Sequence, residues 1–259
     1  MKYNTDINLL GGIQDFHMIY EALNRHFNGE SDLRNVMTQQ NSYGIRTESG
    51  RKRLYDSINS FVLDFKNNNH KSIYQSFFKN LDLGLPFNLL IFWQLSLNND
   101  LFRVLTKDVY LKFYFQGKAH LTAADILFFI NELKETDSDF KQLEWSQLTI
   151  KAIASKYLTI LRKLGLVEGV KKKVIKHVPI SDNELATFLY LFSAVYPNGE
   201  NLLFHEFNVF SFVTAENQLE RMKKLTRKGL IGMTYTGTKL TIEPIINYKD
   251  LSDGIYRRS

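Results

Sequence analysis

The sequence contains no cysteine, and proline is scarce. The absence of cysteine excludes a disulfide framework, cysteine-ligated zinc, iron–sulfur clusters and a cysteine nucleophile. Four prolines and 14 glycines in 259 residues exclude collagen-like and linker-dominated architectures. We therefore expect a folded globular chain whose domain boundaries lie in short connections.

Long hydrophobic runs are missing as well. The most apolar stretch, residues 85–97, contains Asn88 and Gln94 and is shorter than the roughly 20 apolar residues that a membrane span needs. Asp6 lies where a signal peptide would place its apolar core. The sequence predicts a cytoplasmic protein without a membrane partner.

Catalytic motifs are also absent. His205-Glu206 is not followed by a second histidine at helical spacing, and no glycine-rich phosphate loop occurs. The acidic run from Glu132 to Asp139 could hold magnesium, but a solvated helix end explains it better. We expect no enzymatic activity, no metal, no cofactor and no small-molecule substrate.

Most of the chain shows apolar residues at helical spacing, which predicts a mainly α fold. The predicted helices cover residues 15–27, 47–65, 70–81, 86–98, 101–115, 122–135, 146–164, 182–196 and 216–228. A β-hairpin is expected at residues 233–242, around Thr236-Gly237. We divide the chain into a bundle-like N-terminal helical domain (1–118), a winged helix-turn-helix unit (119–180) and a C-terminal helical region with the terminal hairpin (181–259).

The middle region has the most distinctive pattern. Ser146 is placed to cap a helix that Gly165 would end in a left-handed conformation. Short β-branched runs with lysines follow at residues 167–178 and predict a two-stranded ribbon. Helix, glycine exit and basic ribbon is the order typical of a winged helix, although no short middle helix is predicted between Glu135 and Trp145.

Positive charge is concentrated in that region. The chain carries a net charge of +6, whereas residues 146–178 hold eight basic residues and one acid, Glu168. Basic and hydroxyl side chains at helical spacing suit phosphate and groove contacts, so the sequence predicts double-stranded DNA as a partner. The predicted contact residues are Lys151, Ser155, Lys156, Thr159, Arg162 and Lys163 on the helix, and Lys171, Lys172, Lys173 and Lys176 on the ribbon.

A second candidate anion-binding patch lies near the predicted start of the helix at 47–65. Its members are Arg46, Arg51, Lys52 and Arg53. Cations at a helix N-terminus interact unfavourably with the helix dipole. Their presence there therefore suggests a functional role, such as binding an anion. Ordinary surface charge is the competing explanation.

Three segments resemble the A-protein family of BREX (bacteriophage exclusion) loci, which are phage-defence operons. They are the arginine-bearing segment Ile45–Leu54, the apolar and aromatic stretch Leu89–Phe115, and Trp145–Val167. The resemblance implies a mostly helical, cytoplasmic protein with winged-helix character. It also implies double-stranded DNA binding, no catalytic role and other defence proteins as partners. Members of this family have been labelled as membrane proteins, a label with which the sequence disagrees.

The function that we expect is non-enzymatic, largely sequence-independent binding of double-stranded DNA within a bacterial phage-defence system. The helix at 146–164 carries no arginine–asparagine set suited to reading bases. Two alternatives stay open: a winged-helix transcription regulator that reads an operator, and an adaptor that docks partner proteins within the defence complex.

Overall fold

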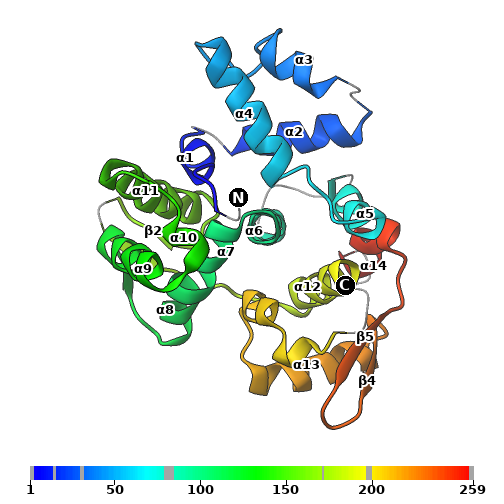
Figure 1. Cartoon of the computed structure of the whole chain (residues 1–259). Coiled ribbons are helices and arrows are strands. Elements are labelled where there is room, and N and C mark those ends of the chain that lie inside the picture. The colour runs from blue at the N-terminus through cyan, green and yellow to red at the C-terminus, as the bar shows by residue number, and fades with distance from the viewer. Residues whose placement is uncertain are drawn as a thin grey trace. The chain divides into compact units, whose positions relative to one another are not determined.

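Figure 1 shows the computed structural model of the chain, which describes residues 3–13, 16–29, 32–78, 85–170, 172–196 and 200–256. These residues form fourteen α-helices and two small antiparallel sheets, so the mainly α prediction is confirmed. The chain divides into two compact units, the first comprising residues 1–64 and 88–177 and the second residues 65–87 and 178–259. The three-domain division proposed from the sequence stays a prediction.

The first unit begins with four helices, α1 (Ile7–Leu10), α2 (His17–Phe27), α3 (Leu33–Thr38) and α4 (Glu48–Phe61). Side chains cap two of them: Asp32 accepts a hydrogen bond from the Asn35 amide, and Thr47 accepts one from the Gly50 amide. Helices α2 and α4 confirm the helices predicted at residues 15–27 and 47–65, although their ends differ from the predicted ones by a few residues. Helices α1 and α3 were not predicted, because four and six residues are too few to show a helical period.

The apolar stretch forms helix α6 (Leu85–Asn98), and its polar residues have a structural purpose. The Gln94 amide nitrogen donates to the carbonyls of Val62 at 2.9 Å and Asp64 at 3.1 Å. The Asn98 amide donates to the Phe61 carbonyl at 2.9 Å. Carbonyls in the last turn of a helix have no partner within the helix. Helix α6 therefore supplies donors to the end of α4.

The helix predicted at 101–115 is present but not uniform. It consists of α7 (Asp100–Leu105), a π-helical segment (Thr106–Leu111) and α8 (Lys112–Phe115). Two buried side chains of the π segment contact the next structural region: the Thr106 hydroxyl lies 3.1 Å from the Tyr157 hydroxyl, and the Tyr110 hydroxyl lies 3.5 Å from the Leu166 carbonyl. A π-bulge shifts side chains relative to a regular helix, and here the shifted turn borders α11.

The rest of the first unit runs β1 (His120–Leu121), α9 (Ala123–Thr136), α10 (Ser138–Lys141), α11 (Gln147–Lys163), β2 (Val167–Glu168) and β3 (Lys173–Ile175). The strands form an antiparallel sheet in the order β1-β3-β2, with His120 opposite Val174 and Val167 opposite Ile175. Helix α10 was not expected: it is one turn long and is capped by Asp137, which accepts from the Phe140 amide.

The helix ends in this region agree with the sequence. Thr122 and Asp125 form a capping box at the start of α9, and Ser146 accepts from the Thr149 amide at the start of α11. Gly165 follows α11 with φ +73°, a conformation that glycine adopts without steric cost. The Leu166 amide then donates back to the Leu161 carbonyl at 3.0 Å. The ends at Ser146 and Gly165 confirm the predicted caps.

The second unit is built around α12 (Asp182–Val195), which packs against α5, α13, α14 and β5. The remaining elements are α5 (Asn68–Phe78), the 3-10 turns Leu202–Phe204, Glu206–Ser211 and Tyr248–Asp250, α13 (Ala215–Arg227), β4 (Ile231–Tyr235), β5 (Leu240–Pro244) and α14 (Leu251–Tyr256). Strands β4 and β5 pair antiparallel, which confirms the predicted hairpin. The Tyr190 hydroxyl ties α12 to it, donating to the Leu230 carbonyl and accepting from the Ile245 and Ile246 amides.

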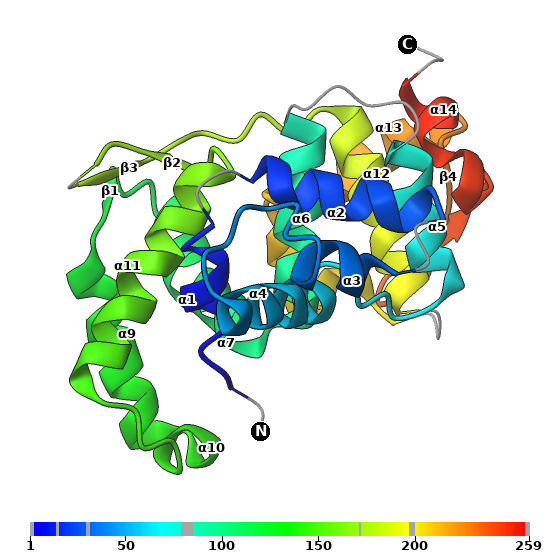
Figure 2. The ribbon, with the colours of Figure 1, turned by 90° about the horizontal axis from the view of Figure 1, so that it is seen from above.

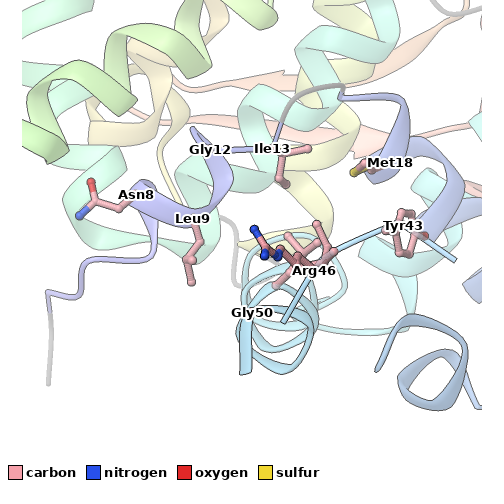
Figure 3. Close-up of a pocket in the computed structure, with 11 residues that line it drawn as sticks. Asn8, Leu9, Gly12, Ile13, Met18, Tyr43, Arg46 and Gly50 are labelled. Carbon is pink, nitrogen blue, oxygen red and sulfur yellow. The ribbon is translucent and has the colours of Figure 1, made fainter. Parts of the chain in front are cut away.

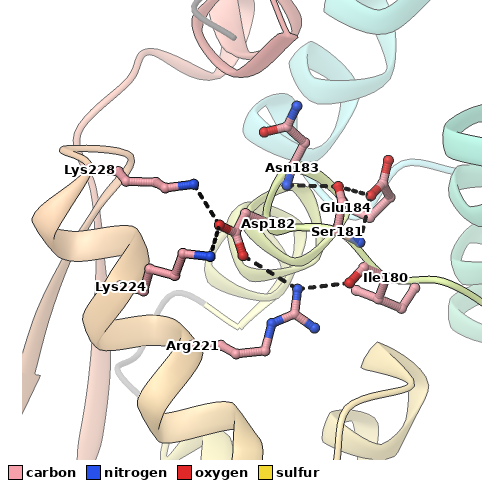
Figure 4. A network of polar contacts seen from close by, with 8 residues as sticks. All are labelled: Ile180, Ser181, Asp182, Asn183, Glu184, Arg221, Lys224 and Lys228. Atoms are coloured by element: carbon pink, nitrogen blue, oxygen red, sulfur yellow. Dashed lines mark hydrogen bonds and ion pairs between the residues drawn. The ribbon is translucent and has the colours of Figure 1, made fainter.

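Asp182 joins the start of α12 to α13 (Figure 4). Its carboxylate lies 2.6 Å from the Lys228 ammonium and 3.0 Å from that of Lys224, and 3.6 Å from the Arg221 guanidinium. Burial alone would raise the pKa of Asp182, but the hydrogen bonds and charges of Lys228 and Lys224 outweigh it and lower that pKa. Three basic side chains of α13 and its C-cap thereby share one carboxylate within the second unit.

Replacing Asp182 with Asn should lower the free energy of unfolding by about 1 kcal/mol at pH 7, because three cations lose their shared anion. A lowered carboxyl pKa stabilises the fold fully above the unfolded-state value near 3.9, and this stabilisation is lost as pH falls through the lower folded-state pKa. The unfolding temperatures of wild type and Asp182→Asn should therefore approach each other as pH falls below about 4.

Glu48→Gln is the matched control, since Glu48 forms only an exposed pair with Lys52 at 2.7 Å. It should leave the unfolding temperature almost unchanged at any pH, because an exposed ion pair contributes little to stability. Equal effects of the two variants at pH 7 would contradict the role assigned to Asp182.

Candidate nucleic-acid interface

Helix α11 separates a buried face from an exposed one. Ile150, Ile153 and Tyr157 are fully buried, and α9 packs beside the helix, with the small sheet near its end (Figure 2). The opposite stripe carries the exposed Lys151, Ser155 and Arg162, and the half-buried Thr159. Four of the predicted contact residues therefore lie on one side of α11, although the Thr159 hydroxyl donates to the Ser155 carbonyl at 2.9 Å.

Two predicted helix lysines face the N-terminal segment instead. Gly11 approaches α11 so closely that a Cβ there would lie 2.6 Å from both the Lys156 Cβ and the Lys156 carbonyl oxygen. The Lys163 ammonium donates to the carbonyls of Gly11 and Ile13, and it lies 5.2 Å from the centre of the Phe16 ring. Lys163 thus binds the chain that leaves α1, and Lys156 lies beside the same segment.

The ribbon lysines also differ from one another. Lys172 and Lys176 are exposed, whereas Lys171 lies outside the described residues. Lys173 is 7% exposed, and its ammonium donates to the carbonyls of Gly169 and Val170 at 2.7 Å each. Burial, followed by the positive charge of Arg162, lowers the pKa of Lys173. Lys173 therefore closes the turn between β2 and β3 from inside.

Exposed apolar side chains near this charge were missed by the sequence analysis. Leu148, in the first turn of α11, is 79% exposed, and Val170, in the ribbon turn, is 81% exposed. An isolated apolar residue is commonly assigned to the core, but Leu148 falls outside the spacing of Ile150, Ile153 and Tyr157. This position outside the buried spacing could have identified Leu148 as an exposed residue from the sequence.

The four members of the second predicted patch have different surroundings. The Arg51 guanidinium donates to the Ile45 carbonyl at 3.2 Å, and Lys52 pairs with Glu48. Arg53 is exposed, and its charge lowers the pKa of Asp6, although burial of that carboxyl raises it overall. Arg46 is exposed and lines a separate pocket.

A comparison with protein-family models identifies the family of this chain. A family model described as BrxA matches residues 1–190. The chain belongs to the BrxA family. BrxA is the A protein of BREX systems, so membership implies a component of phage defence, and the predicted resemblance is confirmed. No curated protein and no solved structure matches the chain.

The BrxA-family match ends within α12, so it includes α11 and the ribbon but not the terminal hairpin. Within the described ranges, no helix is long and apolar enough to cross a membrane. No group of three or more histidine, aspartate or glutamate side chains in that part of the chain is placed to hold a metal ion. In the acidic run at 132–139, Asp137 caps α10 and accepts from the Tyr3 hydroxyl at 2.9 Å.

The adjacent lysines 172 and 173 should respond differently to the same substitution. Lys173→Gln removes an ammonium that holds two carbonyls, which should lower the free energy of unfolding by about 1–2 kcal/mol. Lys172→Gln alters an exposed side chain and should change it by less than about 0.5 kcal/mol. Chemical denaturation followed by circular dichroism measures both, and equal stabilities would contradict the internal role of Lys173.

Proposed function

We propose that this BrxA-family chain binds double-stranded DNA through α11 and the β2–β3 ribbon. Binding would be largely electrostatic and nearly independent of sequence. The observation that carries the proposal is the exposed stripe of Lys151, Ser155 and Arg162 on a helix followed directly by a ribbon with exposed Lys172 and Lys176. Ammonium, guanidinium and hydroxyl groups are the usual partners of DNA phosphates.

The order of elements supports a winged-helix interpretation. Three helices, α9, α10 and α11, follow β1 and precede β2 and β3, and β3 lies between the other two strands. In helix-turn-helix proteins the recognition helix enters the major groove with its N-terminal residues toward the bases. In that arrangement Leu148 and Lys151 of α11 would lie closest to base edges, and Leu148 could contact only apolar groups such as thymine methyls.

The distribution of charge supports phosphate contact over base reading. Lys163 and Lys173 are engaged within the protein, so the accessible cations in the described part of the segment are fewer than the sequence suggested. Those that remain exposed are Lys151, Arg162, Lys172 and Lys176. Each phosphate contact by such a group releases counterions and makes affinity depend on salt.

Within a phage-defence system we propose a non-enzymatic role, in which the chain holds DNA and meets other BREX proteins there. Family membership supports the defence context. Copurification from nuclease-treated lysate would test the contacts with other BREX proteins. Direct protein contacts survive that treatment, whereas contacts bridged by DNA do not.

The experiment that tests DNA binding is fluorescence anisotropy with a labelled random duplex of about 25 base pairs. Four phosphate contacts would make the slope of log K against log salt about −3.6, so affinity should fall more than about a hundredfold between 50 and 200 mM salt. The variant Lys151→Gln/Arg162→Gln/Lys172→Gln/Lys176→Gln should flatten this slope nearly completely, since each contact removed reduces it by about 0.9.

Lys239→Gln/Lys249→Gln is the matched control, because both lysines are exposed and belong to the second unit. It should leave the slope unchanged. No binding by the wild type at 50 mM salt, or an unchanged slope in the fourfold variant, would contradict the proposal.

A further inference from the structure

A pocket of about 400 Å³ lies in the first unit, between the α1 turn, the segment before α4 and α4 itself (Figure 3). Leu9, Gly12 and Ile13 line it on the α1 side, and Arg46, Gly50 and Leu54 on the other. Neither the fold nor the proposed DNA contact requires this space. Its size falls within the range of small-molecule sites.

Two of the residues that line the pocket, Gly44 and Gly50, are glycines. The backbone of Gly44 has φ +64°, a conformation that residues with a side chain rarely adopt. Glycine therefore allows the chain to turn there toward α4. Gly50 lies in the first turn of α4, and a Cβ there would lie 2.8 Å from the Thr47 hydroxyl oxygen and 3.2 Å from Ile45. Glycine at position 50 therefore lets Thr47 and Ile45 lie close against the first turn of α4 in this wall of the pocket.

The electrostatics of the pocket favour an anion. The Arg46 guanidinium extends from the α4 side toward the segment with Leu9 and Gly12 (Figure 3). The Lys156 ammonium lies 3.8 Å from the place that a Cβ on Gly12 would occupy. No acidic residue lines the pocket within the described ranges. The N-terminus of α4, a helix of 14 residues, adds its dipole beside Arg46.

The remaining wall is apolar with one buried polar group. Leu9, Ile13, Met18 and Leu54 supply hydrocarbon surface. Tyr43 is 6% exposed, and its hydroxyl has no hydrogen-bond partner among the described residues. Burial, followed by the charge of Glu21, raises the pKa of Tyr43 to about 12, so the hydroxyl keeps its proton at neutral pH. An unpartnered buried hydroxyl is unusual and is commonly satisfied by a water or a ligand.

We propose that this pocket binds a small organic anion, a carboxylate or phosphate ester with an apolar or aromatic body. The anionic group would pair with Arg46, as guanidinium groups do with carboxylates and phosphates. The body would pack against Leu9, Ile13 and Met18. The ligand would be bound without being chemically changed, and the proposal is independent of DNA binding.

Phenyl phosphate is a suitable probe because it combines an anionic group with an aromatic body. The methyl groups of the methionines report its binding. The chain has five methionines, of which Met18 lines the pocket and Met222 and Met233 belong to the second unit. In carbon-13 methyl spectra, phenyl phosphate should shift the Met18 signal saturably and leave those of Met222 and Met233 in place. Met18→Leu identifies the signal.

Arg46→Gln should weaken phenyl phosphate binding by at least about tenfold, because it removes the ionic partner. Arg53→Gln is the matched control: it removes a nearby exposed arginine outside the pocket and should leave the affinity unchanged. Benzyl alcohol, which has the ring without the anion, should bind at least about tenfold more weakly than phenyl phosphate.

The proposal is overturned if phenyl phosphate fails to move the Met18 signal, or if it moves Met222 and Met233 equally. Equal binding of benzyl alcohol, or undiminished binding by Arg46→Gln, would also overturn it. Because the titration contains no DNA, none of these results depends on whether the chain binds a duplex.

Discussion

The close packing of residues 7–13 on α11 is the contact on which the rest of the first unit depends. At Gly11 the two segments meet at a distance that leaves no room for a Cβ beside Lys156, and two carbonyls at the end of this segment bind the Lys163 ammonium. Helix α11 is therefore held on two faces, by its apolar contact with α9 and by the N-terminal turn. The stripe with Lys151, Ser155 and Arg162 is left to solvent, as are Gln147 and Leu148 in the first turn.

This arrangement separates lysines of the same segment into two groups. The ammonium groups of Lys163 and Lys173 donate to backbone carbonyls within the protein, and a hydrogen bond from a charged donor contributes more than a neutral one. Lys151, Lys172 and Lys176 remain accessible. The N-terminal turn has a further consequence on its other side, where Leu9 and Gly12 form one wall of the pocket that faces Arg46.

The sequence predicted the elements whose signals are local. The cap at Ser146 and the glycine exit at Gly165 follow from short-range chemistry, and the structure has both. One-turn helices such as α10 carry no period and were missed. The π segment at 106–111 could not be predicted, since its buried contacts are with Tyr157 and Leu166, distant in sequence. For the same reason, charge alone did not distinguish Lys163 and Lys173 from exposed lysines, because their partners depend on the tertiary fold and on the register of the ribbon.

The most direct test of the account is lysine footprinting by mass spectrometry, with acetylation carried out in the presence and absence of duplex DNA at low salt. Lys151, Lys172 and Lys176 should be protected by DNA, and Lys239 and Lys249 should not. Lys173 should react slowly in both states, because it is buried. Unchanged reactivity of Lys151, Lys172 and Lys176 at saturating DNA, or protection confined to α13 and the terminal hairpin, would contradict the assignment of α11 and the β2–β3 ribbon as the DNA-binding surface.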